Sequence, residues 1–223
     1  MHILRIYKKY FIPLNLQKHM LKTAGVGKII CDSSNLKLNK TVIVTTLLLH
    51  DMGNILKFDV ENTGFFDRIE LGKIESYKNT KDKYRQKYGP NADKATLAIL
   101  KELGIDYKII ELCAKSHGSH LSNINNFVDK PFWDRKIVYY SDMRAGPFGI
   151  LGVNQRFDDL VKRYPKHKDT LLGDRKKCLT IEKQLQKHSR INLTKIDEDK
   201  VNMAIKELEK GMETTFPDYA SRA

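Results

Sequence analysis

The chain has 223 residues, 41% of them hydrophobic, which suffices for one substantial domain with an extension. No stretch approaches the roughly 18 apolar residues of a membrane span, the first ten residues lack a signal peptide's apolar region, and three scattered cysteines argue against disulfides or a zinc ribbon. We therefore expect a cytoplasmic protein that does not bind membranes. The formal charge of +13 admits an anionic partner, but the basic residues are dispersed, so nucleic acid is weakly supported.

Hydrophobic periodicity predicts an all-α fold, because apolar residues recur at helical spacing along most of the chain. We expect helices near residues 14–32, 39–52, 92–103, 106–117, 131–145, 154–163, 173–189 and 197–213. Residues suited to capping stand near several expected helix starts, and Gly104 is suited to ending a helix; the capping residues are Asn15, Asn39, Asn91 and Asp106. Residues 53–90 form the longest stretch expected to be irregular. A loop of this length beside a functional site is often a lid or a specificity element.

The first polar residue of interest is His19. Apolar residues at positions 16, 20, 26, 29 and 30 form one face of the helix expected over 14–32, and His19 lies at the edge of that face. A lone histidine in such a place is ordinarily a boundary residue. It gains a functional meaning only from partners elsewhere in the chain.

The most informative run is residues 45–54, in which His50 and Asp51 directly follow three leucines. A buried ionised carboxylate without a partner is costly, so Asp51 needs a hydrogen-bond donor, a cation or a metal. Adjacent helical residues point about 100° apart. His50 and Asp51 can therefore share one ion only if other helices complete its shell. A helix C-terminal cap is the alternative, since Gly53 and Asn54 follow.

Asp142 supplies a further carboxylate from an otherwise apolar segment, residues 137–147. The alternatives are that it pairs with Arg144 or caps the following turn. Three separate stretches thus offer polar ligands from apolar faces.

The order His19, then His50 and Asp51, then Asp142 resembles the HD-domain superfamily of metal-dependent phosphohydrolases. In that family, these four residues hold a divalent metal within a bundle of helices. The resemblance covers roughly residues 11 to 150. It implies a metal-binding helical bundle over residues 11–152. Apolar residues at helical spacing predict a helical extension over residues 153–215, which packs on the bundle or forms a homodimer contact.

Imidazole and carboxylate ligands suit one divalent ion such as Mn, Fe, Co, Ni, Zn or Mg. The resemblance implies that metal-bound water attacks the phosphorus of a nucleotide or another small phosphate ester, and that Asp51 helps to orient or deprotonate this water. In HD proteins, a histidine near the end of a later helix commonly faces the active site. This points to His117, more than to His120, as a phosphate contact or proton donor.

The chain departs from the family at two places. Dinuclear members have a histidine where this chain has residues 91–94, and no histidine occurs between positions 51 and 117, which favours a mononuclear site. The residue after the glycine of the His-Asp motif is often lysine in the family, and it is Asn54 here. Lys57, Lys115 and Arg144 are therefore the candidates for binding substrate phosphate. An exposed, uninvolved position is the competing interpretation for each.

Two other functions stay open. A dinuclear-iron oxygenase of HD-like fold would need the additional histidine ligands that this chain lacks. A catalytically inactive nucleotide- or RNA-binding module would agree with the positive charge. Residues 77–88 alternate basic side chains with Tyr77, Tyr84 and Tyr88, which could follow a phosphate backbone and stack bases, although a solvated loop and helix is the simpler interpretation.

Overall fold

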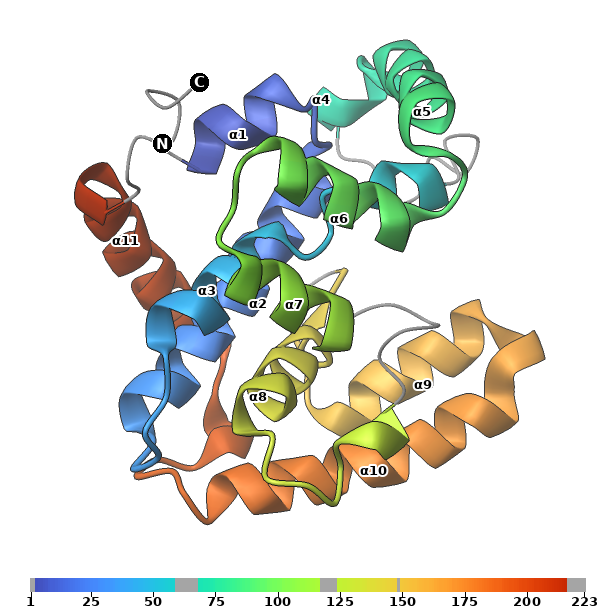
Figure 1. The fold of residues 1–223 in the computed structure, drawn as a ribbon. Coiled ribbons are helices and arrows are strands. Elements are labelled where there is room, and N and C mark those ends of the chain that lie inside the picture. The colour runs from blue at the N-terminus through green and yellow to red at the C-terminus, as the bar shows by residue number, and fades with distance from the viewer. Residues whose placement is uncertain (1–2, 59–67, 117–123, 148, 216–223) are drawn as a thin grey trace.

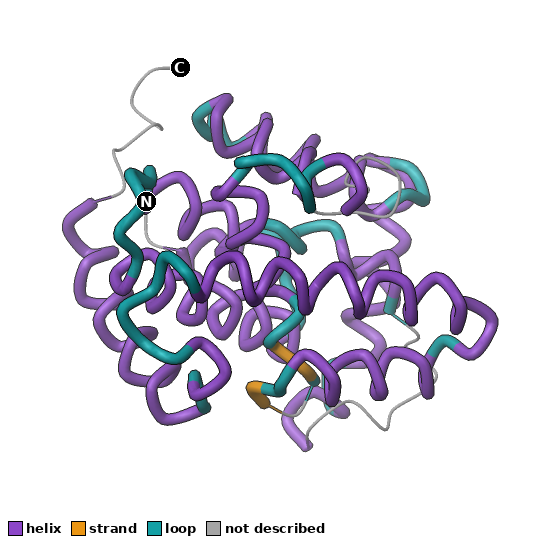
Figure 2. Tube along the Cα trace, turned by 90° about the horizontal axis from the view of Figure 1, so that it is seen from below, coloured by secondary structure: helices purple, strands orange, loops and turns teal. Residues whose placement is uncertain are grey.

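The structure is a computed structural model that describes residues 3–58, 68–116, 124–147 and 149–215. The all-α prediction is confirmed, since helices make up most of the described chain (Figure 1). The only sheet within these residues is a hairpin of two short antiparallel strands, β1 (Ala145–Gly146) and β2 (Gly149–Ile150), shown in orange in Figure 2. Among the described residues, no helix combines the length and the apolar character needed to cross a bilayer.

Helix α2 (Leu14–Ser33) is central to the packing. It lies against α3 (Lys40–Leu49), α8 (Trp133–Asp142) and α11 (Glu198–Thr215). Two glycines of α2 make close packing feasible: a Cβ atom on Gly27 would lie 2.2 Å from Leu47 Cδ1, and one on Gly25 would lie 2.9 Å from Val201 Cγ1. Only hydrogen at these positions lets α3 and α11 approach α2 so closely.

Other elements surround this centre. The N-terminal part adds α1 (Ile3–Lys9), η1 (Asn54–Lys57), α4 (Arg68–Leu71), α5 (Ile74–Tyr88), α6 (Ala92–Glu102), α7 (Tyr107–Ser116) and η3 (Ile124–Asn126). The C-terminal part adds α9 (Val153–Arg163), η4 (Pro165–His167), α10 (Lys168–Gln186) and η5 (Leu193–Lys195). Helices α9 and α10 pack side by side, and α10 also contacts α8 (Figure 1). Buried residues of α10 and α11 belong to the same apolar core as those of α2 and α3.

Helix ends follow the local sequence. The side chains of Asn39 and Asn91 accept hydrogen bonds from the backbone N–H groups of Val42 and Lys94, at 3.1 and 2.9 Å, and so cap α3 and α6. Gly104 adopts a φ of 65° after α6, a left-handed conformation that glycine reaches without strain. The helices expected from the sequence are all present, although α10 begins several residues earlier than predicted.

The prediction for residues 53–90 was wrong, because this stretch contains η1, α4 and the 15-residue helix α5. The buried face of α5 consists of Tyr77, Thr80 and Tyr84, which recur at helical spacing. Apolar periodicity missed this face because two tyrosines and a threonine form it. Helix α1 was also not predicted; its Ile3, Ile6 and Tyr7 are buried.

Candidate metal centre

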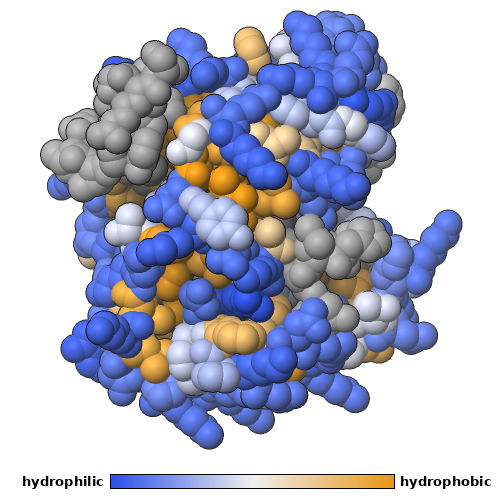
Figure 3. Space-filling view, in the orientation of Figure 1, coloured by the Kyte–Doolittle hydropathy of each residue, from blue (hydrophilic) through white to orange (hydrophobic). Residues whose placement is uncertain are grey.

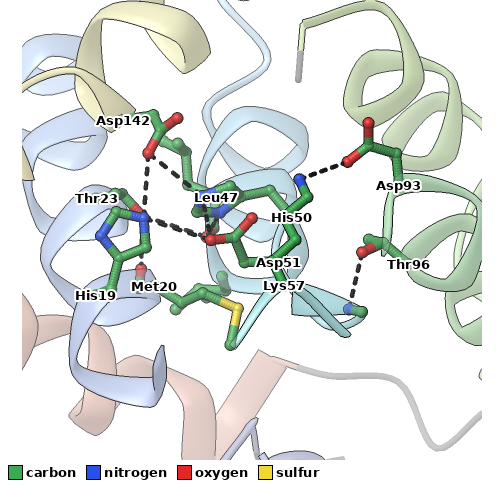
Figure 4. Close-up of polar contacts among 12 residues, drawn as sticks. His19, Met20, Thr23, Leu47, His50, Asp51, Lys57, Asp93, Thr96 and Asp142 are labelled. Atoms are coloured by element: carbon green, nitrogen blue, oxygen red, sulfur yellow. Dashed lines mark hydrogen bonds and ion pairs between the residues drawn. The ribbon is translucent and has the colours of Figure 1, made fainter. Parts of the chain in front are cut away.

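Three helices bring the four predicted ligands together. His19 lies in α2, His50 is the C-cap residue of α3, Asp51 follows it in the turn, and Asp142 is the last residue of α8 (Figure 4). All but His19 are buried, and the His19 side chain is 19% exposed.

Distances between the polar atoms are short. His19 Nε2 lies 3.1 Å from Asp142 Oδ1 and 3.6 Å from Asp51 Oδ2. His50 Nε2 lies 3.6 Å from Asp142 Oδ1 and 3.8 Å from Asp51 Oδ2. Ligating atoms of His19, His50 and Asp51 all lie within 4.8 Å of one another, in a group that could hold a metal ion. We call these three residues and Asp142 the His-Asp cluster.

The donor set fits a divalent ion. With metal–ligand bonds of about 2.1 Å, two ligand atoms lie about 3.0 Å apart at right angles and about 3.4 Å apart at the tetrahedral angle. The four nitrogen–oxygen distances, 3.1 to 3.8 Å, are close to these edges of a coordination polyhedron. Imidazole nitrogen and carboxylate oxygen are ligands that borderline and hard divalent ions accept.

Backbone contacts orient the histidine of the His-Asp pair. His50 Nδ1 lies 2.7 Å from the carbonyl oxygen of Leu47, so a proton on Nδ1 donates to that oxygen. This contact favours the tautomer whose Nε2 lone pair faces the cluster. The neighbouring carbonyl of Leu48 accepts a 2.6 Å hydrogen bond from the Tyr7 hydroxyl. Burial and the negative charge of Asp51 both raise the pKa of Tyr7, which keeps this hydroxyl protonated.

The turn after Asp51 is fixed against α6. Gly53 N–H donates a 2.8 Å hydrogen bond to Thr96 Oγ1 (Figure 4). A Cβ atom on Gly53 would lie 2.2 Å from the carbonyl oxygen of Ala92, so only glycine fits here. His50 is the C-cap residue of α3, as the capping alternative predicted, and its Nε2 also faces the carboxylates of the cluster.

No family model matches this chain, and neither a curated protein nor a solved structure shows significant similarity to it. The fold and the geometry of the cluster are therefore described without a family assignment. The protein is mostly helical and contains a buried group of two histidines and aspartate that could hold a metal ion.

The structure places the predicted phosphate-binding lysines on the surface, each with an acidic partner. Lys57 Nζ lies 3.0 Å from Asp93 Oδ1, beside the cluster, and the lysine side chain is 53% exposed (Figure 4). Lys115 pairs with Glu111 one turn earlier in α7. His117, the predicted catalytic histidine, and His120 lie outside the described residues.

The guanidinium of Arg144 is directed into the protein interior and not towards a substrate phosphate. It is buried, and its guanidinium donates hydrogen bonds to Tyr140 Oη at 2.8 Å, to the carbonyls of Leu193 and Ile196 at 2.7 and 2.8 Å, and to that of Leu151. Four of the five N–H groups of an arginine are thus used inside the protein. This placement ties the segment before α11 to the end of α8. It also counts against the pairing of Arg144 with Asp142.

Arg156 is a residue that sequence reasoning missed. It is buried in α9, its Nη1 lies 3.1 Å from Asp159 Oδ2, and its buried Nε has no hydrogen-bond partner among the described residues. Burial lowers the pKa of this guanidinium, and the negative charges of Asp142 and Asp159 oppose that shift. No sequence signal marked Arg156, because α9 reads as an ordinary amphipathic helix after the region of resemblance.

Proposed function

We propose that this protein is a metal-dependent phosphohydrolase of the HD-domain type that cleaves a nucleotide or another small phosphate ester. The convergence of two imidazole nitrogens and two carboxylate oxygens from three helices carries this proposal. The order of His19, His50, Asp51 and Asp142 along the chain, which resembles that of the HD family, supports it further.

His19, His50, Asp51 and Asp142 would hold one divalent ion, of the group Mn, Fe, Co, Ni, Zn and Mg. A bound divalent ion lowers the pKa of coordinated water from about 15.7 towards 7 and neutralises charge on a phosphoryl oxygen. Four protein ligands leave positions on a five- or six-coordinate ion for water and substrate.

The protein's own groups then have distinct roles. The Leu47 carbonyl holds His50 so that Nε2 faces the cluster. Asp51 would orient the attacking water or accept its proton. Arg156 has an unused buried N–H donor, and its charge interacts with that of Asp142, so we assign this cation to the phosphoryl oxygens. Lys57 is a second cation at the rim, once Asp93 releases it. His117 stays a predicted proton donor.

The two alternative functions make different demands. A dinuclear-iron oxygenase needs a second set of ligands, whereas the described residues contain one group of metal-ligating side chains, His19, His50 and Asp51. A binding module without catalysis would bind nucleotide tightly and never turn it over. Neither is favoured by a specific contact.

Activity of the metal-stripped protein tests the proposal. Each of Mn, Mg, Co, Ni, Fe and Zn is added back singly, with nucleotides and generic phosphomonoesters and phosphodiesters as substrates. We expect metal-dependent release of phosphate or nucleoside from at least one substrate, lost in His50→Ala and Asp142→Ala and kept in His167→Ala, which alters an exposed histidine of η4. Oxygen consumption without phosphate release, or turnover that survives Asp142→Ala, would contradict it.

A further inference from the structure

A cavity of about 720 Å³ lies at the C-terminal end of α1. Its walls are the residues that follow this helix, one side of α5 and the end of α6. It shares no lining residue with the His-Asp cluster. Its volume falls within the range of about 300–1,000 Å³ typical of small-molecule sites. Helices α1, α5 and α6 lie together at the top of Figure 1.

The charge of the cavity favours an anion. Its lining includes Lys9, Lys83 and Lys87 against one acidic residue, Glu102. Lys87 pairs with Glu102 at 2.8 Å, and the hydroxyl of Tyr88 donates to the same carboxylate, also at 2.8 Å. Glu102 is thus neutralised within the wall. The charges of the two other lysines are left to attract a ligand.

Aromatic side chains form part of the same wall. Phe11 is 64% exposed and has a φ of 50°, a left-handed backbone conformation that is unusual for a bulky residue. Tyr10 and Tyr88 lie beside it, partly buried. An exposed ring held in a strained conformation beside two lysines offers a flat apolar face next to positive charge, which suits a heteroaromatic ring that carries phosphate.

The geometry also limits the size of the ligand. Tyr77 and Tyr84 of α5 are each only 6% exposed, and the hydroxyl of Tyr84 donates to the carbonyl of Tyr10 at 2.8 Å. The alternation of tyrosines with basic residues in α5 therefore does not present a row of rings to successive bases. The surface over α5 is mostly hydrophilic, blue at the upper right of Figure 3, and one side of this helix lines the cavity.

We propose that this cavity binds a nucleotide unit, with the base against Phe11 and the phosphates on Lys9 and Lys83. Ser76 and Asn79, which also line the cavity, supply hydrogen-bonding groups for the base or the sugar. The site is separate from the His-Asp cluster, and its existence does not depend on the hydrolase proposal. The unit is either a free mononucleotide or one residue of a single strand.

Calorimetric titration of the full chain in EDTA tests this proposal. The probes are ATP, GTP and UTP for a free mononucleotide and a short oligothymidylate for a single strand. Lys9→Gln/Lys83→Gln removes the two available cations and leaves the Lys87–Glu102 pair intact. Phe11→Gly removes the ring and suits the positive φ. Lys166→Gln/Lys168→Gln, on the exposed surface around η4, is the matched charge control, and Asp142→Ala disables the cluster.

We expect at least one probe to bind the wild type, about tenfold weaker binding in each cavity variant, and unchanged affinity in the charge control and in Asp142→Ala. Binding of oligothymidylate alone, with the same losses, would identify the unit as part of a strand. Absence of binding by every probe would overturn the proposal. So would full affinity in both cavity variants, and so would loss of affinity in Asp142→Ala alone, which would place the nucleotide at the cluster. Melting temperatures of all variants check that they fold.

Discussion

Arg144, just after α8, and Arg156, in α9, are both buried, but their surroundings differ. Arg144 donates four hydrogen bonds to protein oxygens, three of them backbone carbonyls. Arg156 has one ion pair, with Asp159, and an Nε without a partner among the described residues. Its guanidinium is also acted on by Asp142 of the cluster.

The difference shows how the role of a buried arginine can be inferred from the partners of its N–H groups. A guanidinium whose donors are used by carbonyls from distant segments holds those segments together, and nothing is left for a ligand. One with an unused buried donor, whose charge also interacts with a candidate metal ligand, can bind an anion, because an unsatisfied buried N–H gains most from a new acceptor. Arg144 thus holds segments of the fold together, and we propose that Arg156 serves the site.

Arg144→Met should have the largest effect on stability. The carbonyls of Leu193, Ile196 and Leu151 would lose their donor in the interior, and we expect the free energy of unfolding to fall by about 3–5 kcal/mol. Urea denaturation followed by circular dichroism measures this. Arg5→Met, on the exposed surface of α1, should change little. An equal loss in both variants would mean that the buried hydrogen bonds of Arg144 contribute nothing beyond its charge.

Arg156→Met should act on catalysis. Removing one charged donor to the phosphoryl group should lower kcat/KM about 10- to 100-fold, with the midpoint of urea unfolding close to that of the wild type. Arg156→Lys should restore part of the activity. Steady-state kinetics with the substrate found in the panel and the unfolding curve of the same preparation give both values. A loss of stability as large as that of Arg144→Met would make the two arginines equivalent and remove the distinction.

Tyr140→Phe should weaken the Arg144 network by a smaller amount. The Tyr140 hydroxyl accepts from Arg144 Nη1 and donates a 2.6 Å hydrogen bond to Glu182 Oε2 in α10. Its loss should reduce the free energy of unfolding by about 1–2 kcal/mol. Activity per folded molecule should not change, because the hydroxyl bonds to Arg144 and Glu182, neither of which is a predicted metal ligand. A lowered kcat under conditions in which the variant is fully folded would show that the Arg144 network also affects the His-Asp cluster.

Asp159→Asn should have the smallest effect. Asp159 pairs with Arg156 and with Arg163, at 3.1 and 2.6 Å, on a partly exposed face of α9. Such pairs contribute about 0.2–1 kcal/mol, so only a slight loss of stability is expected. If Asp159, more than Asp142, determines the position of Arg156, then kcat/KM in Asp159→Asn would fall as far as in Arg156→Met.

Much of the fold could be predicted from the sequence because its helices have apolar faces and clear ends. Asn39 and Asn91 cap helices as their positions suggested, and Gly104 ends one. Helix α5 could not be predicted in this way, because tyrosines and threonine form its buried face. Its packing against the segment after α1 depends on tertiary contacts such as the hydrogen bond from Tyr84 to Tyr10.

For the site, the sequence indicated four candidate metal ligands. The structure brings these residues, His19, His50, Asp51 and Asp142, within a few ångströms of one another. The arginines show where sequence reasoning fails. Arg144 is near Asp142 in the chain, yet its donors point towards the segment before α11. Arg156 lies beyond the region of resemblance, and only the fold returns it to the vicinity of Asp142.

Metal binding by the His-Asp cluster is the central claim, and its stoichiometry tests that claim most directly. Metal-stripped protein is dialysed against Mn²⁺ or Co²⁺, and bound metal is measured by elemental analysis beside the visible spectrum of the Co²⁺ form. We predict one ion per chain, lost in His50→Ala and in Asp142→Ala and retained in His167→Ala. Less than stoichiometric binding, or one ion still bound in Asp142→Ala, would contradict the account and leave the four residues as histidine–carboxylate ion pairs.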